Sequence, residues 1–378
     1  MQRMRKAVKK SHDHMKKSVE MADEFDYYDG EANFIGDYTL EVKGQTIKGK
    51  TIFIVSGARP LIPPIKGVES IEYLTNESVL QLTERPESMI IVGGGYIAAE
   101  FAHFFEAMGT QVAIVQRNKR LVPDEEPEIS ELLKTVLSHR MKVLTGTEAV
   151  EVRQTGKVVT VTAKERDSGK QIELTAHSLL IAAGRKSNAD VLMVQNTGVK
   201  TDERGYIIVD DFLETTKKDI WAFGDAISKK MFRHSANHEA ELVWHNAIHG
   251  KKSRMNYLTV PHAVFSYPEI ASVGLTEEQA IKLMGKHEVL VGKAMYTDVA
   301  RGEAMMETEG FTKAVVHPKS GKILGYHIIG PQASVLIQEV VNAMAADGNL
   351  WSVAKGMHIH PALAEVVLKA FARLEETD

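Results

Sequence analysis

Hydrophobic residues recur at helical spacing within the first 21 residues of the chain. Met4, Val8, Met15 and Val19 lie four or seven residues apart, and the basic residues fall mostly between them. This pattern predicts an amphipathic helix over residues 3–21. A basic amphipathic helix can act as a targeting sequence or as a nucleic-acid-binding arm, but its composition is more typical of the exposed face of an ordinary surface helix.

Two strand patterns follow this helix. Hydrophobic and polar residues alternate over residues 38–42, before a turn at residues 44–45, and a continuous hydrophobic run at residues 52–55 ends at Ser56 and Gly57. Alternation is typical of a half-buried strand, and a short hydrophobic run bounded by a turn is typical of a buried one. The sequence therefore predicts a small antiparallel excursion that leads into a buried strand.

The middle of the chain has the pattern of a mononucleotide-binding unit. Residues 89–116 have the order strand, glycine turn, helix, strand. Residues 150–172 alternate in short stretches and predict a meander, and a second buried strand at residues 179–183 ends at Gly184. An α/β fold with a Rossmann-like domain is expected.

The character of the sequence changes after about residue 255. Alternating strands precede a helix that ends at Gly348 and whose hydrophobic face comprises Leu336, Ile337, Val340, Val341 and Met344. We place domain boundaries near residues 72, 192 and 258. The resulting segments are 1–71, 72–192, 193–258 and 259–378.

Composition narrows the class of protein. The 378 residues include 46 Lys and Arg against 50 Asp and Glu, which gives a net charge of −4 and no surplus for binding nucleic acid or anionic lipid. No hydrophobic run approaches the ~20 residues of a membrane span. We therefore expect a cytoplasmic, multidomain protein with neither a nucleic-acid nor a membrane partner. The absence of cysteine excludes disulfides, thiolate metal sites, iron–sulfur clusters and a cysteine nucleophile from these residues.

The strongest local motif is the glycine turn after residue 92. Gly93 permits a tight turn, Gly95 lets the backbone approach a pyrophosphate, and Ala98 provides the third small position, where helix and strand pack closely. The N-terminus of the following helix presents free amides to the phosphates. We predict a dinucleotide site here, on a helix ended by Gly109 with a core face of Ile97, Phe101, Phe104, Phe105 and Met108.

The end of the second strand bears on the choice of nicotinamide nucleotide. An acidic residue there would bind the ribose hydroxyls of NADH, whereas cations accommodate the 2′-phosphate of NADPH. Gln116 occupies the position and is followed by Arg117, Lys119 and Arg120. This favours NADPH, with NADH left open because three cations on an exposed loop are common.

Two further turns and a histidine pair carry weaker signals. Residues 51–67 end a buried strand in a small-residue turn, and residues 215–225 end a strand at Gly224 and Asp225, whose carboxylate could bind a sugar alcohol. Taken singly, each of these patterns is more often a plain loop. Near the C-terminus, Glu365 can reach back to His360 across Pro361. Either the two residues form a general acid/base pair, or His360 merely caps a helix.

The other histidines do not predict a metal site. His234 and His238 are four residues apart, as are His245 and His249, which places each pair on one helical face. The pair His238-Glu239 lacks the second histidine of a zinc protease motif. Solvent-facing histidines are expected.

Together these segments resemble the flavin-dependent pyridine nucleotide-disulfide oxidoreductases, the family of dihydrolipoamide dehydrogenase, glutathione reductase and mercuric reductase. The resemblance implies FAD- and NAD(P)-binding Rossmann-like domains and an α+β dimerisation domain in a homodimer. Segments 1–71 and 193–258 would belong to the FAD domain, 72–192 to the NAD(P)H domain and 259–378 to the dimerisation domain. The matching stretches are residues 51–67, 93–98, 180–188, 215–225, 265–277, 325–331 and 360–365.

The resemblance also implies roles for individual residues. Asp225, with Gly224, would bind the ribityl chain of FAD, and the turns at Ser56-Gly57 and Gly184 would belong to the cofactor sites. Tyr96 would sit as a lid where nicotinamide enters, and Glu100 would lie near the flavin ring. His360 and Glu365 would form the acid/base dyad of the neighbouring subunit's active site. Ser187 and Ala98 depart mildly from the family pattern, which often has proline and glycine there.

The largest departure is at the N-terminus. The family opens with a glycine fingerprint for the ADP half of FAD, followed by a helix with a redox-active cysteine pair, and neither is found in residues 1–378. We expect an N-terminally shortened disulfide reductase of the dihydrolipoamide dehydrogenase type, able to pass hydride from NAD(P)H to FAD but not to a disulfide.

Two alternatives remain open. One is a non-catalytic, dimeric NAD(P)H-binding remnant, and the other is a cysteine-independent diaphorase. The substrate of the full-length parent would be a lipoyl or small-molecule disulfide. The final four residues, Glu375, Glu376, Thr377 and Asp378, lack the cysteine pair that ends mercuric reductases, which argues against mercury.

Overall fold

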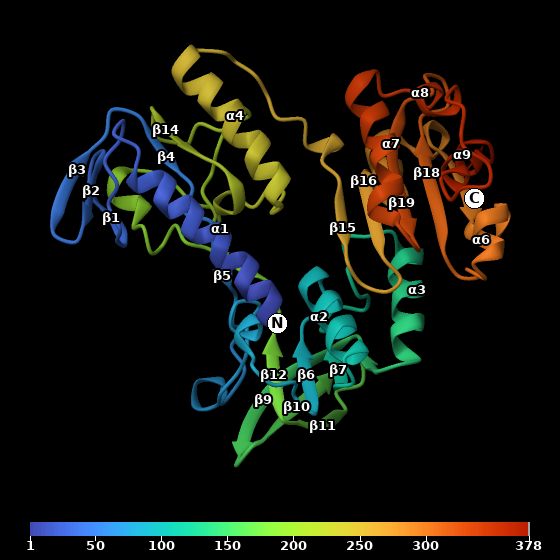
Figure 1. Cartoon of the computed structure of the whole chain (residues 1–378), viewed down its shortest axis with the longest axis horizontal. Coiled ribbons are helices and arrows are strands. Elements are labelled where there is room, and N and C mark those ends of the chain that lie inside the picture. The colour runs from blue at the N-terminus through green and yellow to red at the C-terminus, as the bar shows by residue number, and fades with distance from the viewer. Residues whose placement is uncertain (377–378) are drawn as a thin grey trace. The chain divides into compact units, whose positions relative to one another are not determined.

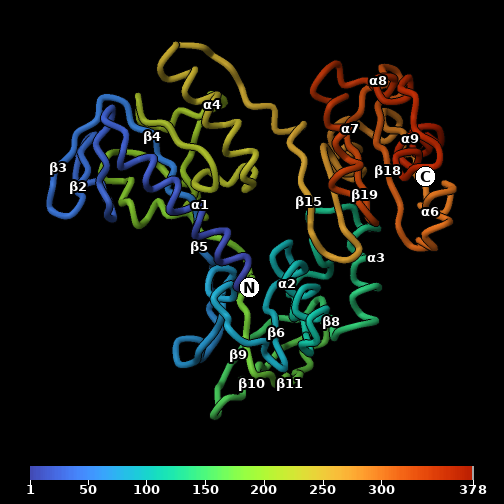
Figure 2. Tube along the Cα trace, in the orientation of Figure 1, coloured from blue at the N-terminus to red at the C-terminus, as the bar shows by residue number. Residues whose placement is uncertain are grey.

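The computed structural model describes residues 1–376 and divides them into two compact units. The first comprises Met1–Ile62, Thr75–Glu84 and Gly184–Tyr257, and the second comprises Pro63–Leu74, Arg85–Ala183 and Leu258–Asp378, of which the last two residues are not described. Figures 1 and 2 show the elements and the path of the chain. The boundaries predicted near residues 72, 192 and 258 stay predictions.

The first unit is built from short strands around a small core. Its strands are β1 (Ala32–Gly36), β2 (Thr39–Val42) and β3 (Gln45–Lys48) in one antiparallel sheet, β4 (Ile52–Ile54) parallel to β14 (Ile220–Ala222), and β5 (Ala58–Pro60) antiparallel to β13 (Arg185–Ser187). The predicted antiparallel excursion is confirmed. The strand predicted at residues 52–55 forms as β4, but only Ile54 is buried and Val55 is exposed, so its predicted burial is largely wrong. The helices are α1 (Gln2–Glu20) and α4 (Arg233–His249), and 3-10 turns lie at Ser78–Gln81, Val194–Thr197, Gly224–Ala226 and Tyr257–Thr259.

Helix α1 forms where the sequence predicts it, but its hydrophobic stripe is not buried. Every residue of α1 is at least partly exposed in the described structure, and Val8 and Met15 are more than half exposed. Arg5 links the helix to the rest of the unit by donating to the carbonyls of Leu80 and Leu82 at 3.2 and 2.9 Å.

The parallel sheet of the second unit has the strand order β12-β6-β7-β8. It comprises β6 (Ser88–Val92), β7 (Gln111–Val115), β8 (Lys142–Leu144) and β12 (Ser178–Ile181), with helices α2 (Tyr96–Ala107) and α3 (Pro127–Ser138). The predicted meander is an antiparallel sheet of β9 (Thr147–Thr155), β10 (Val158–Glu165) and β11 (Gln171–Ala176). A 3-10 turn lies at Val68–Ser70.

The predicted core face of α2 is largely wrong. Phe105 is buried, but Phe104 is 39% exposed and Met108 55% exposed, while Ile97 and Phe101 are only partly covered. The residues that pack inward with Phe105 are Ala98, Ala99 and Ala102. Small side chains let the helix approach the strands closely, so the aromatic residues are displaced to the flanks.

The C-terminal part of the second unit is a six-stranded antiparallel sheet covered by helices. The strands, in spatial order, are β15 (His262–Val264), β16 (Ile270–Gly274), β19 (Ile323–Ile329), β18 (Phe311–Val316), β17 (Leu290–Met295) and β20 (Glu375–Glu376). Helix α7 (Ala333–Ala346) packs on β16 and β19, and α9 (Glu365–Phe371) on β17 and β18 (Figure 1). Further helices are α5 (Glu277–Met284), α6 (Ala300–Ala304) and α8 (Trp351–Ala354), with 3-10 turns at Lys286–Glu288 and Tyr296–Asp298.

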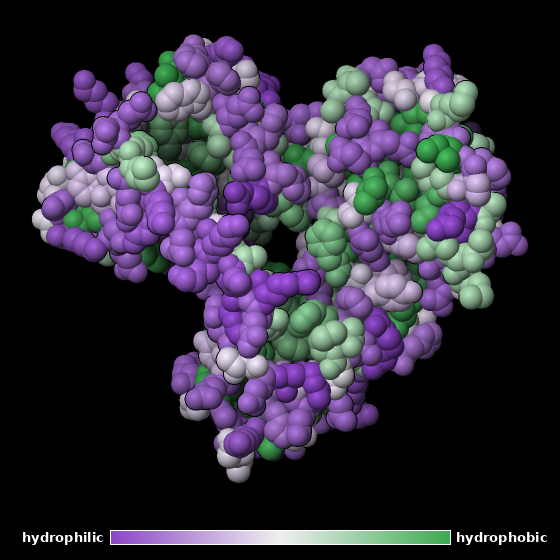
Figure 3. All heavy atoms as spheres, viewed as in Figure 1, coloured by the Kyte–Doolittle hydropathy of each residue, from purple (hydrophilic) through white to green (hydrophobic). Residues whose placement is uncertain are grey.

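Helix α7 buries the face predicted for it. Leu336, Ile337, Val340 and Met344 are buried, whereas Val341, the fifth predicted residue, is only partly buried. Gly348 follows the helix with a left-handed φ of 72°. The face of the molecule drawn in Figure 3 is mostly hydrophilic, with hydrophobic residues in small groups. Among residues 1–376, no helix has the length and hydrophobicity that a membrane span needs.

Candidate functional site

The glycine turn connects β6 to α2 with a geometry that requires glycine at its first position. Gly93 has a φ of 129°, and a Cβ atom there would lie 2.1 Å from the carbonyl oxygen of Ala182. Its N–H donates to the carbonyl of Val115 at 2.9 Å, which ties the turn to β7. Both the conformation and the close backbone contact exclude a side chain at this position.

Gly95 occupies a different environment. It is the N-cap of α2, and a Cβ atom there would meet no protein atom within 4 Å. The first intrahelical bond runs from the N–H of Ala99 to the carbonyl of Gly95 at 3.0 Å, so the preceding amides have no acceptor within the helix. Ala98 is fully buried against the sheet. The open side of the turn is therefore suited to an anion at the positive end of the helix.

Gln116 follows β7 and folds back onto this turn. It is 95% buried, its side chain packs against Gly94, and its Nε2 donates to the carbonyl of Arg120 at 3.3 Å. Lys119 pairs with Asp167 at 3.1 Å, and Arg120 lies 4.0 Å from Glu278. These exposed cations, and not a carboxylate, border the end of β7.

Arg117 has the least restrained side chain in this group of cations. It is exposed, and within residues 1–376 it forms no hydrogen bond or ion pair through its side chain. The guanidinium is therefore available to a phosphate without first breaking an internal contact.

Tyr96 opens α2 and lies against two residues that sequence reasoning missed. Its hydroxyl is 3.1 Å from Nε2 of His262, the first residue of β15, and the two rings stack at 5.3 Å. His262 Nε2 is also 2.6 Å from Oε1 of Glu125, and Oε2 of Glu125 accepts from the Ser272 hydroxyl at 2.6 Å. Glu125 and Ser272 are buried. We call Tyr96, His262, Glu125 and Ser272 the tyrosine cluster.

The surroundings of Tyr96 and Glu125 within the tyrosine cluster shift the pKa values of both side chains. Burial, together with the neighbouring charge of Glu125, raises the pKa of the Tyr96 hydroxyl well above its ordinary value. Burial also opposes ionisation of Glu125, but hydrogen bonds from His262 and Ser272 outweigh it and hold the pKa of this carboxyl below its ordinary value. An ionised carboxylate facing a neutral phenol is the expected state near pH 7.

Glu100 lies one turn after Tyr96 on α2. Its Oε1 accepts the backbone N–H of Phe265 at 3.0 Å, and burial raises its pKa, with that bond acting in the opposite direction. Glu100 therefore ties α2 to the segment between β15 and β16. Its predicted place near a flavin ring stays a prediction.

In the first unit, the structure brings together the segments that follow the predicted turns at Ser56-Gly57 and Gly184. Strands β5 and β13 pair, the side chain of Asn188 donates to the carbonyl of Ser56 at 2.8 Å, and its N–H donates to that of Gly57 at 3.2 Å. Gly57 and Gly184 have φ angles of 66° and 135°. Two sequence segments more than 120 residues apart thus form one local site.

Asp225 follows Gly224, whose φ is 69°. Its Oδ2 is 3.5 Å from Nε of Arg185, and the N–H of Gly224 donates to Oε2 of Glu239 at 2.7 Å. Glu239 is fully buried, and its Oε1 accepts the hydroxyl of Tyr257 at 2.8 Å. Sequence reasoning considered Glu239 only in an incomplete zinc motif, whereas it anchors the loop that presents Asp225.

The histidine and glutamate predicted as a pair near the C-terminus do meet. His360 Nδ1 and Glu365 Oε1 are 2.9 Å apart, and Oε2 accepts the N–H of Ala362 at 3.0 Å. Glu365 is the first residue of α9, and residues 361–364 lie before the helix begins. The bonds from Ala362 and then His360 lower the pKa of Glu365. The His360 side chain is 70% exposed.

A second histidine–glutamate pair lies beside this one. His358 Nε2 is 3.0 Å from Oε2 of Glu339 on α7, and its Nδ1 is 3.0 Å from the carbonyl oxygen of Gly356. His358 and Glu339 are 19 positions apart in the sequence, and no periodic pattern predicts that they pair.

The histidines of α4 form no metal site among the described residues. His245 and His249 approach through their Nδ1 atoms at 2.9 Å, but residues 1–376 contain no group of three or more metal-ligating side chains.

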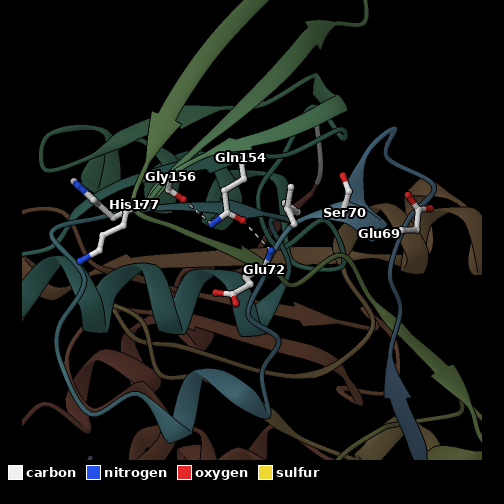
Figure 4. Close-up of a pocket in the computed structure, with 8 residues that line it drawn as sticks. Glu69, Ser70, Glu72, Gln154, Gly156 and His177 are labelled. Carbon is white, nitrogen blue, oxygen red and sulfur yellow. Dashed lines mark hydrogen bonds between the residues drawn. The ribbon is translucent and has the colours of Figure 1, made fainter.

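An open pocket of about 710 Å³ lies away from the glycine turn. Figure 4 shows Gln154 near its centre, accepting from the N–H of Glu72 and donating to the carbonyl of Gly156. His177, which also lines the pocket, precedes β12, whereas Gly93 follows the parallel strand β6. The pocket and the glycine turn therefore lie at opposite ends of the parallel sheet.

Comparison with known proteins decides the family. A model described as pyridine nucleotide-disulphide oxidoreductase matches residues 2–249, and the dimerisation-domain model of the same family matches residues 260–371. The chain belongs to the pyridine nucleotide-disulphide oxidoreductases. Members of this family use FAD and NAD(P)H, and the predicted family, cofactors and α/β fold class are confirmed.

Curated relatives of this oxidoreductase come from several branches of the family. Mycothione reductase of Mycobacterium tuberculosis is 38% identical over 346 residues, which are 90% of this chain and 74% of that protein. Mercuric reductase of Staphylococcus aureus is 36% identical over 83% of this chain and 57% of that protein. Dihydrolipoyl dehydrogenase of Synechocystis is 33% identical over 91% of this chain and 73% of that protein.

A solved structure extends the similarity to nearly the whole chain. The Cu(II) complex of the HOCl-induced flavoprotein disulfide reductase RclA from Escherichia coli superposes with a TM-score of 0.87 at 29% identity. The match covers 98% of this chain and 84% of RclA. This oxidoreductase chain is thus similar to flavoprotein disulfide reductases throughout, and shorter than each of these relatives.

Proposed function

We propose that this chain acts as an NAD(P)H-dependent FAD oxidoreductase of the dihydrolipoamide dehydrogenase type and that its residues support the hydride step from NAD(P)H to FAD. The observation that carries the proposal is the glycine turn. Gly93 cannot be replaced without a backbone clash, while Gly95 faces open space at the start of α2. A turn that is closed on the protein side and open on the other is what a bound pyrophosphate requires.

The proposed nucleotide is NADPH. Gln116 is folded inward and offers no carboxylate to a ribose 2′-hydroxyl, and Arg117 is exposed without an internal partner among the described residues. A 2′-phosphate would gain a charge-assisted bond there. NADH would gain no comparable contact.

Residues of the first unit fit part of a flavin site. Ser56 Oγ and Arg185 Nε are buried polar atoms with no hydrogen-bond partner in the described structure, and Asp225 lies beside Arg185. These groups could bind the sugar alcohol of FAD. The flavin, when bound, would supply the hydride acceptor. The glycine fingerprint for the ADP half of FAD is not found in residues 1–378.

The disulfide step lies outside what these residues can perform. Reduction of a disulfide proceeds through a mixed disulfide with a thiolate, and residues 1–378 contain no cysteine. We propose that the disulfide substrate of an enzyme containing these residues is a lipoyl or small-molecule disulfide. His360 with Glu365 would be the acid/base pair, serving the partner subunit in a homodimer. The exposure of His360 supports that role.

The test is turnover with an artificial acceptor. Purified protein supplied with FAD should oxidise NADPH when ferricyanide is present, and the Gly95→Ala variant should lose this activity. Protein that binds NADPH but shows no FAD-dependent turnover would favour the dimeric, non-catalytic alternative.

A further inference from the structure

The open pocket of about 710 Å³ has side chains of opposite charge at its two ends. Figure 4 shows Glu69 at one end, His177 at the other and Gln154 between them. Lys157, which also lines the pocket, follows Gly156 on the His177 side of Gln154 (Figure 4). The volume lies within the roughly 300–1,000 Å³ that is typical of small-molecule sites. The pocket is therefore acidic at one end and basic at the other.

The acidic end consists of two carboxylates on one segment of the chain. Glu69 and Glu72 line the pocket, and both are exposed. Within residues 1–376 neither carboxylate forms a hydrogen bond or an ion pair. An ammonium group could thus form charge-assisted hydrogen bonds here without displacing an internal cation.

The basic end combines a free ammonium with an oriented imidazole. Lys157 is exposed, and its side chain has no partner in the part of the chain that the structure describes. The Ser88 hydroxyl accepts the backbone N–H of His177 at 3.0 Å and is 2.9 Å from its Nδ1. The hydroxyl proton is then donated to Nδ1, so the neutral ring carries its own proton on Nε2. Nε2 is 3.7 Å from Glu87, too far for a hydrogen bond, and can donate to a carboxylate.

Strand β9 offers main-chain groups between these two ends. The N–H of Lys66 donates to the carbonyl of Val150 at 3.1 Å, and the N–H of Val152 donates to that of Lys66 at 2.8 Å. Because main-chain groups alternate along a strand, those of Gln154 also point away from β10. The segment after Lys66 leaves β9 through the 3-10 turn at Val68–Ser70. A strand edge left open in this way can pair with an extended peptide.

We propose that this pocket binds a short, extended peptide with two free termini, its ammonium group at the Glu69 end and its carboxylate at the Lys157 end. The main chain of Gln154 pairs with a residue between the two termini. The inference is independent of the proposed function, because the pocket and the glycine turn lie at opposite ends of the parallel sheet. The peptide should therefore leave the Kd of NADPH unchanged.

Three related peptides test the two ends separately by isothermal titration of the full chain. Trialanine has both charged termini, N-acetyl-trialanine lacks the ammonium group, and trialanine amide lacks the carboxylate. Trialanine should bind, and each derivative should bind about threefold to tenfold more weakly, because each loses one exposed charge-assisted contact.

Two variants assign the termini to the ends of the pocket. Glu69→Gln should weaken trialanine and trialanine amide about threefold to tenfold and leave N-acetyl-trialanine unchanged. Lys157→Gln should weaken trialanine and N-acetyl-trialanine by a similar factor and leave trialanine amide unchanged. The matched controls are Glu148→Gln on β9 and Lys164→Gln on β10, two exposed residues that do not line the pocket. Both controls should leave all three dissociation constants unchanged.

Three results would overturn the peptide site: no binding of trialanine at up to about 10 mM, equal affinities for the three peptides, or the same loss for all three in Glu69→Gln. Trialanine that competes with NADPH would also overturn it, because the peptide would then occupy the nucleotide site. A chain that binds trialanine as expected but not NADPH would refute the proposed function alone.

Discussion

His360 Nδ1 lies 2.9 Å from Oε1 of Glu365, and the other carboxylate oxygen accepts the N–H of Ala362. The glutamate is thus held on both oxygens at the start of α9, while the imidazole projects into solvent. A fixed carboxylate that orients an exposed imidazole is the geometry that the proposed acid/base role requires. Both residues lie in the segment matched by the dimerisation-domain model.

Substitution by alanine should affect ligand binding at one glycine of the turn and stability at the other. Gly95→Ala should fold like wild type, because its Cβ meets no protein atom, but should weaken NADPH binding at least tenfold by obstructing the pyrophosphate. Gly93→Ala should destabilise the fold by about 1–3 kcal/mol or more, since it combines a positive φ with a backbone clash. Thermal unfolding and NADPH titration distinguish the two effects. Unchanged NADPH affinity in Gly95→Ala would refute the assigned site.

Arg117 should select the nucleotide. Arg117→Gln is expected to weaken NADPH binding about tenfold and to leave NADH binding unchanged. Loss of a charge-assisted hydrogen bond costs about 1.5–3 kcal/mol, and solvent exposure reduces this cost. Lys157→Gln removes the same charge from the pocket at the other end of the parallel strands and serves as the control. Equal losses for NADPH and NADH would contradict a 2′-phosphate contact.

Lys313 should be a major contributor to stability. It is 97% buried and pairs with Glu126, Glu128 and Glu277 at 2.9, 3.0 and 2.7 Å. Lys313→Met would leave buried Glu126 without its cation, so the free energy of unfolding should fall by about 3–5 kcal/mol in urea denaturation. Lys293→Met removes a half-exposed partner of Glu128 and should cost less than about 1 kcal/mol. Similar losses in the two variants would show that burial does not decide the effect.

Glu239 should make stability depend on pH. Burial raises its pKa above 4.5 in the folded chain, with the bonds from Gly224 and Tyr257 acting in the opposite direction. Between the unfolded value of 4.5 and the raised folded value, the folded state binds the extra proton, so stability falls as pH rises through this window. Glu239→Gln should remove that slope, and Glu241→Gln, an exposed change on the same helix, should retain it. Urea midpoints measured across the window test this, and an identical slope in Glu239→Gln would contradict it.

Local patterns predicted much of the fold and part of the candidate site. The strand–turn–helix around Gly93 and the pairing of His360 with Glu365 depend on residues close in sequence, where spacing constrains geometry. The tyrosine cluster could not be predicted, because Glu125 and His262 are 137 residues apart and meet only through the tertiary fold. The core face of α2 was misjudged because its inward alanines carry a weaker hydrophobic signal than the phenylalanines beside them.

The proposed hydride transfer from NADPH to FAD needs no cysteine of this chain. Anaerobic titration of the FAD-supplied protein with NADPH, followed by the visible absorbance of the flavin, tests it most directly. The flavin absorbance should fall in proportion to the NADPH added and should be restored by ferricyanide. A flavin absorbance that stays constant while NADPH binds would contradict it.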